Sequence, residues 1–146
     1  MSKILVTGAP GYLGSHIVAK LLSRPGISKV IGTTRSLKNY PRISQFKSKF
    51  DIELLEANCL SSQTCFSDIA ASHKPDYILH LACPFMEGLN LSLYSHQIRS
   101  YTESCRNLAE VAECKKLVFT GAASSVVGML PGVYEDPLVW ADLDDI

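Results

Sequence analysis

Three glycines at intervals of three residues stand near the start of the chain. Gly8, Gly11 and Gly14 lie in the segment TGAPGYLG, between a short apolar run and a pattern typical of a helix. Such a turn brings backbone N–H groups to the start of a helix, where they can hold a diphosphate. The first glycine permits a tight turn, the second keeps a Cβ away from the diphosphate, and the third lets the helix pack closely. The spacing therefore predicts a dinucleotide-binding loop.

The end of the second apolar run indicates which dinucleotide is bound. An NAD site usually places Asp or Glu there to hold the ribose 2′-hydroxyl. Here the run ends Gly-Thr-Thr-Arg at 32–35, and the next acidic residue is Asp51. The guanidinium of Arg35 can pair with a 2′-phosphate, and Lys38 can add positive charge. We therefore expect NADP(H) rather than NAD(H), the alternative being a solvated surface arginine.

Further candidates follow the later apolar runs. Asn58 can hydrogen-bond an adenine amino group or simply form a turn. Small residues after His80 leave room for the cofactor, and His80 itself is expected to be a packed residue rather than a general base. The predicted cofactor-binding residues are Gly8, Pro10, Gly11, Tyr12, Leu13, Gly14, Arg35, Lys38, Asn58, Cys59, Leu81, Ala82, Cys83 and Thr120.

These residues need a scaffold in which strands alternate with helices. Strand-like apolar runs occupy 3–7, 29–34, 52–56, 77–82 and 116–120, and helical patterns occupy 11–23, 41–50, 61–72 and 92–114. This alternation predicts right-handed crossovers and a parallel sheet covered on both faces. We expect a Rossmann-type, doubly wound α/β fold, a three-layer αβα sandwich with strand order 3-2-1-4-5. The cofactor should lie across the carboxyl ends of strands one and four.

Length and composition indicate a single domain. The chain has 146 residues, of which 47% are hydrophobic, with 14 basic and 14 acidic residues. We expect one NAD(P)-binding domain over 1–146, with a core at 1–125 and a loop at 126–146 leading to a missing C-terminal substrate part. Zero net charge argues against nucleic acid or an anionic membrane as partner. No apolar run reaches the ~20 residues of a membrane span.

The cysteines and the first residues bear on the compartment. The five cysteines are odd in number and contain no CxxC pair, which favours thiols over a disulfide framework or a metal site. The first residues lack the pattern of a signal peptide. We therefore expect a cytoplasmic protein without a metal.

Several segments together resemble the extended short-chain dehydrogenase/reductases, also called the NAD(P)-dependent epimerase/dehydratase superfamily. Within it, they are similar to the dihydroflavonol reductase and cinnamoyl-CoA reductase-like branch. The segments are VTGAPGYLGSHI at 6–17, TTR at 33–35, LEANCL at 55–60, ILHLACP at 78–84, NLAEVAEC at 107–114, KLVFT at 116–120 and VYEDPLVWADL at 133–143. The resemblance implies a Rossmann sheet, NADPH, a small-molecule carbonyl or alcohol substrate, reversible carbonyl reduction, and helices through which family members form homodimers. It also implies that Thr120 lines the nicotinamide pocket.

The resemblance further implies a catalytic Ser, Tyr and Lys, of which this chain offers only a serine. In the family the lysine lowers the tyrosine pKa, the tyrosine transfers a proton and the serine hydrogen-bonds the reacting oxygen. Ser124 is the candidate serine; a gapless match places Ala122 there, and Ser125 is a further alternative. None of the six tyrosines has a lysine four residues on, so we expect that pair after Ile146.

Three functions are compatible with these features. The first is an NADPH-dependent reductase of which this chain is the N-terminal, cofactor-binding part. The second is a catalytically incompetent NADP-binding or regulatory protein, and the third is a non-reductase epimerase or dehydratase relative. A Tyr-x-x-x-Lys pair in a continuation of the chain would favour the first.

Overall fold

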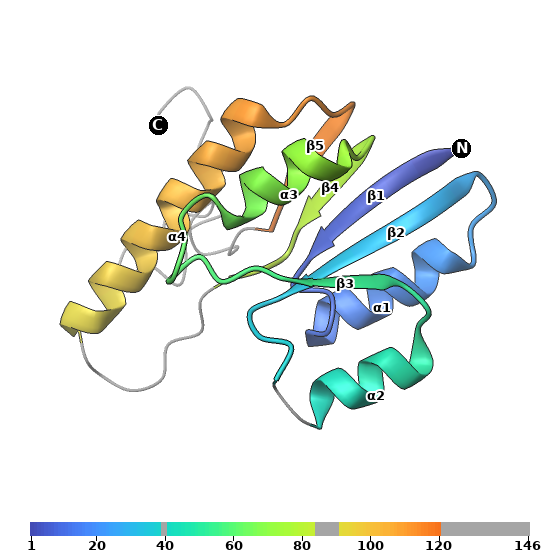
Figure 1. Cartoon of the computed structure of the whole chain (residues 1–146), viewed down its shortest axis with the longest axis horizontal. Helices are drawn as coiled ribbons and strands as arrows, with labels where there is room; N and C mark the ends of the chain where they lie inside the picture. The colour runs from blue at the N-terminus through green and yellow to red at the C-terminus, as the bar shows by residue number, and fades with distance from the viewer. Residues whose placement is uncertain (39–40, 84–90, 121–146) are drawn as a thin grey trace, which may run out of the picture.

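A computed structural model describes residues 1–38, 41–83 and 91–120 of the chain. Strands and helices alternate along it (Figure 1). The elements are β1 (Ser2–Thr7), α1 (Tyr12–Leu22), β2 (Ile27–Thr34), α2 (Arg42–Lys49), β3 (Glu53–Glu56), α3 (Cys65–His73), β4 (Tyr77–His80), α4 (Leu91–Val111) and β5 (Lys116–Phe119).

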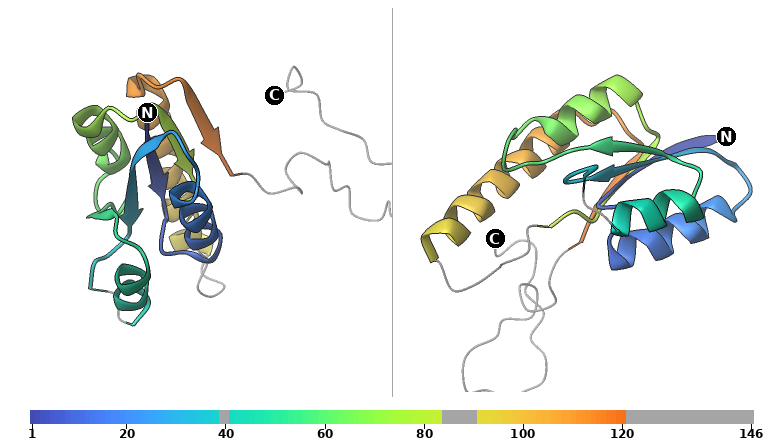
Figure 2. Two further views of the ribbon diagram at one scale, coloured as in Figure 1. Left: turned by 90° about the vertical axis from the view of Figure 1, so that its right-hand side faces the viewer. Right: turned by 60° about the horizontal axis from the view of Figure 1, so that its bottom comes forward.

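The strands form one five-stranded sheet in the order β3-β2-β1-β4-β5. Every neighbouring pair of strands is parallel. Figure 2 shows α1 and α2 on one side of this sheet and α3 and α4 on the other. The predicted Rossmann-type fold, its three layers and its strand order are therefore confirmed.

Two hydrophobic cores lie on the two faces of the sheet, because successive strand residues point to opposite sides. From β1, Ile4 and Val6 join Val18 of α1 and Phe46 of α2 in one core. Leu5, between them, belongs to the other core. That second core also contains Phe66 and Ala70 of α3, Ile78 of β4 and Leu108 of α4. Helices therefore pack against both faces of the central strand β1.

Two element boundaries differ from the sequence expectation for reasons visible in the hydrogen bonds. The third helix begins at Cys65 rather than at 61, because the carbonyl of Asn58 accepts the N–H groups of Ser61 and Ser62 in a turn. The fourth strand ends at His80 rather than at 82, because the hydroxyl of Thr7, the last residue of β1, accepts the N–H groups of Leu81 and Ala82. The turn at Asn58 and the segment that follows His80 both lie at the carboxyl ends of the strands.

Some expectations fall outside the described residues. These are Ser124, its alternatives Ala122 and Ser125, and the loop at 126–146. Within the described ranges, no helix combines the length and apolarity that crossing a membrane requires.

Candidate functional site

The glycine turn forms where β1 passes into α1. Gly8 has φ +69°, in the left-handed region that glycine adopts without strain. The N–H of Gly11 donates to the Gly8 carbonyl at 2.9 Å, and Gly11 precedes the first residue of α1 without a side-chain cap. A Cβ at Gly14 would meet the Gly8 carbonyl oxygen and lie 2.7–2.8 Å from backbone atoms of Ala9. The turn therefore depends on close backbone approach and leaves helix-end amides for an anion.

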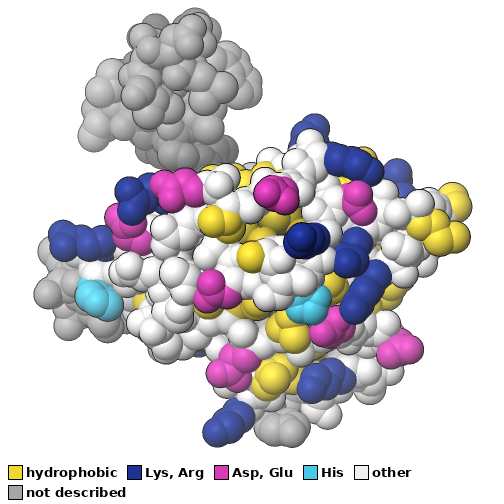
Figure 3. Space-filling model, turned by 45° about the horizontal axis from the view of Figure 1, so that its top comes forward, with side chains coloured by type: hydrophobic (Ala, Val, Ile, Leu, Met, Phe, Trp, Pro, Cys, Tyr) yellow, Lys and Arg dark blue, Asp and Glu magenta, His cyan; other side chains and the backbone are white. Residues whose placement is uncertain are grey.

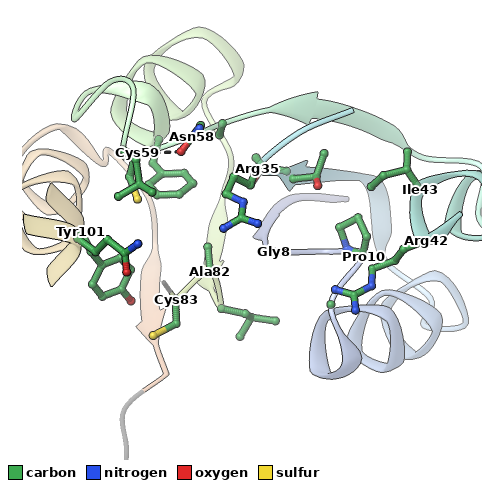
Figure 4. A pocket seen from close by; sticks show the side chains of 18 residues that line it. Gly8, Pro10, Arg35, Arg42, Ile43, Asn58, Cys59, Ala82, Cys83 and Tyr101 are labelled. Carbon is green, nitrogen blue, oxygen red and sulfur yellow. Dashed lines mark hydrogen bonds between the residues drawn. The ribbon is translucent and has the colours of Figure 1, made fainter. Parts of the chain in front are cut away.

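A cleft of about 280 Å³ opens beside this turn at the carboxyl ends of the strands (Figure 4). It includes nine of the residues predicted to bind a cofactor. These are Gly8, Pro10, Gly11, Arg35, Asn58, Cys59, Leu81, Ala82 and Cys83.

The other predicted residues do not line this cleft. Tyr12 and Leu13 are 86% and 50% exposed at the start of α1, and Gly14 is buried against the turn. Lys38 is exposed in the loop after β2. Thr120 extends the contact between β4 and β5, its N–H donating to the His80 carbonyl at 3.2 Å.

Two arginines give the cleft a positive charge. Arg35 follows β2 and reaches toward the middle of the cleft, whereas Arg42 is the first residue of α2 and lies beside Pro10 (Figure 4). Among the described residues that line the cleft there is no carboxylate. Glu56, at the end of β3, instead accepts the backbone N–H of Leu37 at 3.0 Å. The cleft therefore favours a ligand with several negative charges.

Sequence reasoning missed Arg42, although one signal was available. A cation in the first turn of a helix is unfavourable to the helix dipole, and a nearby anion offsets this effect. Arg42 occupies this position in α2, whose first turn contains no acidic residue. An anionic ligand in the cleft would supply that compensation. Other missed residues of the cleft wall are Thr33, Thr34, Ile43, Ala57, Leu60, Phe66, Gln97 and Tyr101.

A buried hydroxyl group in the cleft wall also points to a ligand. Thr33 is 1% exposed and lines the cleft, yet its Oγ1 has no hydrogen-bond partner within the described part of the chain. A buried hydroxyl without a partner carries a desolvation cost, which a polar ligand atom at this wall would offset. Together with the glycine turn and the two arginines, it fits an anionic dinucleotide.

Asn58 takes the turn-forming role that the sequence left open. Its side-chain oxygen accepts the N–H of Leu60 at 3.1 Å, which is an Asx-type turn. The turn shapes the wall of the cleft after β3. A contact between Asn58 and an adenine ring stays a prediction.

His80 is a buried structural residue in the floor beneath the cleft. The Thr7 hydroxyl accepts the N–H groups of Leu81 and Ala82, both at 3.0 Å. With both lone pairs used, it donates its proton to Nδ1 of His80, 3.0 Å away. Nε2 of His80 therefore carries the ring proton and donates to Sγ of Cys105 at 3.4 Å. Burial lowers the pKa of His80 to about 4, so the ring is neutral near pH 7.

The five cysteines all lie in the described ranges and form no disulfide with one another. Over these same ranges, His, Cys, Asp and Glu side chains form no group of three suited to a metal ion.

The sequence profile of the NAD dependent epimerase/dehydratase family matches residues 4–139. The chain therefore belongs to this family, within the superfamily of nicotinamide dinucleotide-dependent reductases and epimerases.

Individual relatives include both enzyme types. A dihydroflavonol 4-reductase of Gerbera hybrida is 26% identical over 151 residues, covering 98% of this chain and 40% of that protein. Yeast methylglyoxal/isovaleraldehyde reductase Gre2, solved with NADPH, has a TM-score of 0.67 at 21% identity over 86% of this chain and 38% of its own. UDP-glucose-4-epimerase of Stenotrophomonas maltophila, solved with NAD, has a TM-score of 0.66 at 20% identity over 91% of this chain and 41% of its own. The two solved structures support the fold, and the chain spans about two fifths of each of these proteins.

Proposed function

We propose that this chain binds NADP(H) and forms the cofactor-binding part of an oxidoreductase that reduces a carbonyl group to an alcohol. The proposed enzyme is of the dihydroflavonol reductase-like type and acts on a small-molecule carbonyl compound. One observation carries the cofactor preference: the cleft joins the glycine turn to Arg35 and Arg42 and has no carboxylate among its described lining residues. The Gerbera reductase and the yeast reductase solved with NADPH support the reaction type.

Each part of the cleft has a role in this proposal. The backbone amides at the start of α1, which follows the glycine turn, face the diphosphate. Arg35 and Arg42 pair with the 2′-phosphate through charge-assisted hydrogen bonds, and Thr33 offers its buried hydroxyl to the ligand. The nicotinamide supplies or accepts the hydride when bound. The residues described here bind and orient the cofactor, whereas the groups that transfer the proton are proposed to lie elsewhere in the protein.

An epimerase is the alternative function, because one of the similar solved structures is an epimerase with bound NAD. An NAD site usually holds the ribose 2′-hydroxyl with a carboxylate at the end of the second strand. In this chain Thr34 ends β2 and Arg35 follows it. The cationic residue at this position is therefore the reason to prefer NADP(H).

Calorimetric titration of the chain with NADPH and with NADH tests the proposal. We expect NADPH to bind more tightly, and Arg35→Ala or Arg42→Ala to weaken NADPH binding by about tenfold to a hundredfold, the usual worth of a charged hydrogen bond. NADH binding should change by less than about threefold, because NADH has no 2′-phosphate to lose a contact.

Lys38→Ala is the matched control. It removes an equal charge from the same loop, but Lys38 does not line the cleft. Its effect on NADPH should be well below that of Arg35→Ala. Equal losses of NADPH and NADH affinity in the arginine variants would contradict the phosphate role.

A further inference from the structure

Two cysteine thiols lie in the wall of the same cleft. Cys59 follows β3 and Cys83 follows β4. Cys59 is half-buried, and burial raises the pKa of its thiol. Cys83 is exposed. The two thiols thus share one cavity but differ in access to molecules in solution.

Cys83 stands next to the place where the segment after β4 approaches the glycine turn. A Cβ at Gly8 would lie 3.1 Å from both Cα and N of Ala82, so these two backbones are nearly in contact. Cys83 is the next residue along the chain, and Figure 4 shows its side chain at the end of β4 beside the cleft. A bulky group attached to its sulfur would occupy part of the cleft that the dinucleotide is proposed to fill, because Cys83 lines that cleft.

Two further features of the cavity wall fit the binding of an anionic ligand. The Thr33 hydroxyl is buried in its wall and has no hydrogen-bond partner among the described residues. Arg35 and Arg42 line the same cavity without a carboxylate from the described residues beside them. A small disulfide that carries carboxylates would be drawn to this cavity by the same charges that favour a phosphorylated dinucleotide.

We propose that Cys83 is a modification site at which a small anionic disulfide closes the cleft to NADP(H). This inference rests on the proposed function, since it describes a regulation of the same cleft. The Cys83 thiolate attacks one sulfur of the small disulfide, a new S–S bond forms and the old one breaks. The Cys83 sulfur is oxidised, and the departing thiolate is reduced and takes up the proton that Cys83 released. Excess thiol reverses the reaction.

The mixed disulfide and the dinucleotide exclude each other. Bound dinucleotide must therefore hinder modification of Cys83, and modification of Cys83 must weaken dinucleotide binding. The probe is glutathione disulfide, and peptide mass spectrometry follows the modified fraction of each cysteine in the 146-residue chain. Saturating NADP⁺ should slow modification of Cys83 by about tenfold or more. Calorimetry on the treated chain should show an NADPH affinity at least about tenfold weaker, restored by dithiothreitol.

Variants and a second reagent separate this site from general oxidation. Cys83→Ala, compared with its own untreated sample, should keep its NADPH affinity after treatment, whereas Cys59→Ala should respond as the wild type does. Cystamine, a cationic disulfide, should react more slowly at Cys83 than glutathione disulfide does. For each reagent, the rate at Cys83 in the folded chain is divided by the rate at the same cysteine in the urea-unfolded chain. This ratio removes the difference in intrinsic reactivity between the two disulfides.

The outcomes separate the two proposals. Modification of Cys83 that is unaffected by bound NADP⁺, or that leaves NADPH affinity unchanged, overturns this inference alone. Failure of glutathione disulfide to modify Cys83, or faster normalised reaction with cystamine, does the same. A reduced, untreated chain that binds neither dinucleotide overturns the proposed function and this inference with it.

Discussion

At the residue scale, His80 is kept neutral by its surroundings. Its ring is fully buried, with Thr7 on one nitrogen and Cys105 on the other. The rings of Phe66 and Phe119 meet it edge-on, and Tyr101 stacks on it at 5.7 Å. The sequence indicated a packed histidine from its place in an apolar strand. It did not indicate the proton arrangement, which follows only from the two amides that converge on Thr7.

The lowered pKa of His80 predicts a loss of stability in acid. The folded pKa of about 4 lies below the ordinary value of 6.5, so the unfolded chain binds the extra proton first. Stability is therefore complete above about pH 6.5 and falls as the pH drops toward about 4. His80→Asn keeps an acceptor for the Thr7 hydroxyl but removes the titration.

Urea unfolding at pH 7 and pH 4 measures this effect. The wild type should lose about 3 kcal/mol more than His80→Asn between these pH values. Both proteins contain the same carboxylates, so the effect of carboxylate protonation on stability cancels in this difference. His16→Asn, at an exposed position of α1, should show the wild-type pH dependence. The same acid loss in His80→Asn as in the wild type would show that His80 does not cause it.

At the element scale, the start of α1 depends on its approach to the glycine turn. Gly14 lies in the first turn of the helix, where alanine would ordinarily favour helix formation. Here the added Cβ would meet backbone atoms of Gly8 and Ala9, which cannot rotate away as a side chain could. The steric cost should therefore exceed the gain in helix propensity.

Gly14→Ala should lower the free energy of unfolding by about 1–3 kcal/mol, the usual cost of overpacking. It should also weaken NADPH binding, because α1 must shift against the turn. Urea unfolding and calorimetry measure the two effects. Ser15→Ala, the next position of the same helix, should change stability by no more than about 0.5 kcal/mol. A Gly14→Ala protein as stable as the wild type would refute the close-packing role.

The sequence predicted these elements because the periodicity of apolar residues differs between strands and helices. Their boundaries were less predictable where side chains compete for backbone amides, as Asn58 does before α3 and Thr7 does after β4. Arg35 could be assigned because it follows a strand directly. Arg42 could not, because its place in the cleft depends on how α2 lies beside the glycine turn.

At the scale of the whole molecule, the sheet and its two cores bring residues from distant parts of the sequence to one edge. Basic and acidic side chains are interspersed over the face in Figure 3, in keeping with 14 of each in the chain. The chain therefore has no net charge to attract an anion from a distance, and the positive charge of the cleft comes from Arg35 and Arg42 in its wall. A ligand bound there contacts residues that follow β1, β2, β3 and β4, so it should stabilise the fold as a unit.

Thermal unfolding tests this link between binding and folding. NADPH at a concentration one hundred times its dissociation constant should add about 2.7 kcal/mol to the stability of the chain. For a protein of this size, that corresponds to a rise in Tm of roughly 5–10 °C. NADH at the same concentration should raise Tm less. Equal rises for the two dinucleotides would contradict the preference for the 2′-phosphate.

The central claim is that the turn at Gly8–Gly14 holds a diphosphate while Arg35 and Arg42 hold the 2′-phosphate. The most direct measurement is a crystal structure of the chain with NADP⁺. It should show the diphosphate over the turn and the 2′-phosphate within hydrogen-bond distance of at least one of the two guanidinium groups. A dinucleotide bound elsewhere, or bound in the cleft with its 2′-phosphate turned away from both arginines, would contradict the account.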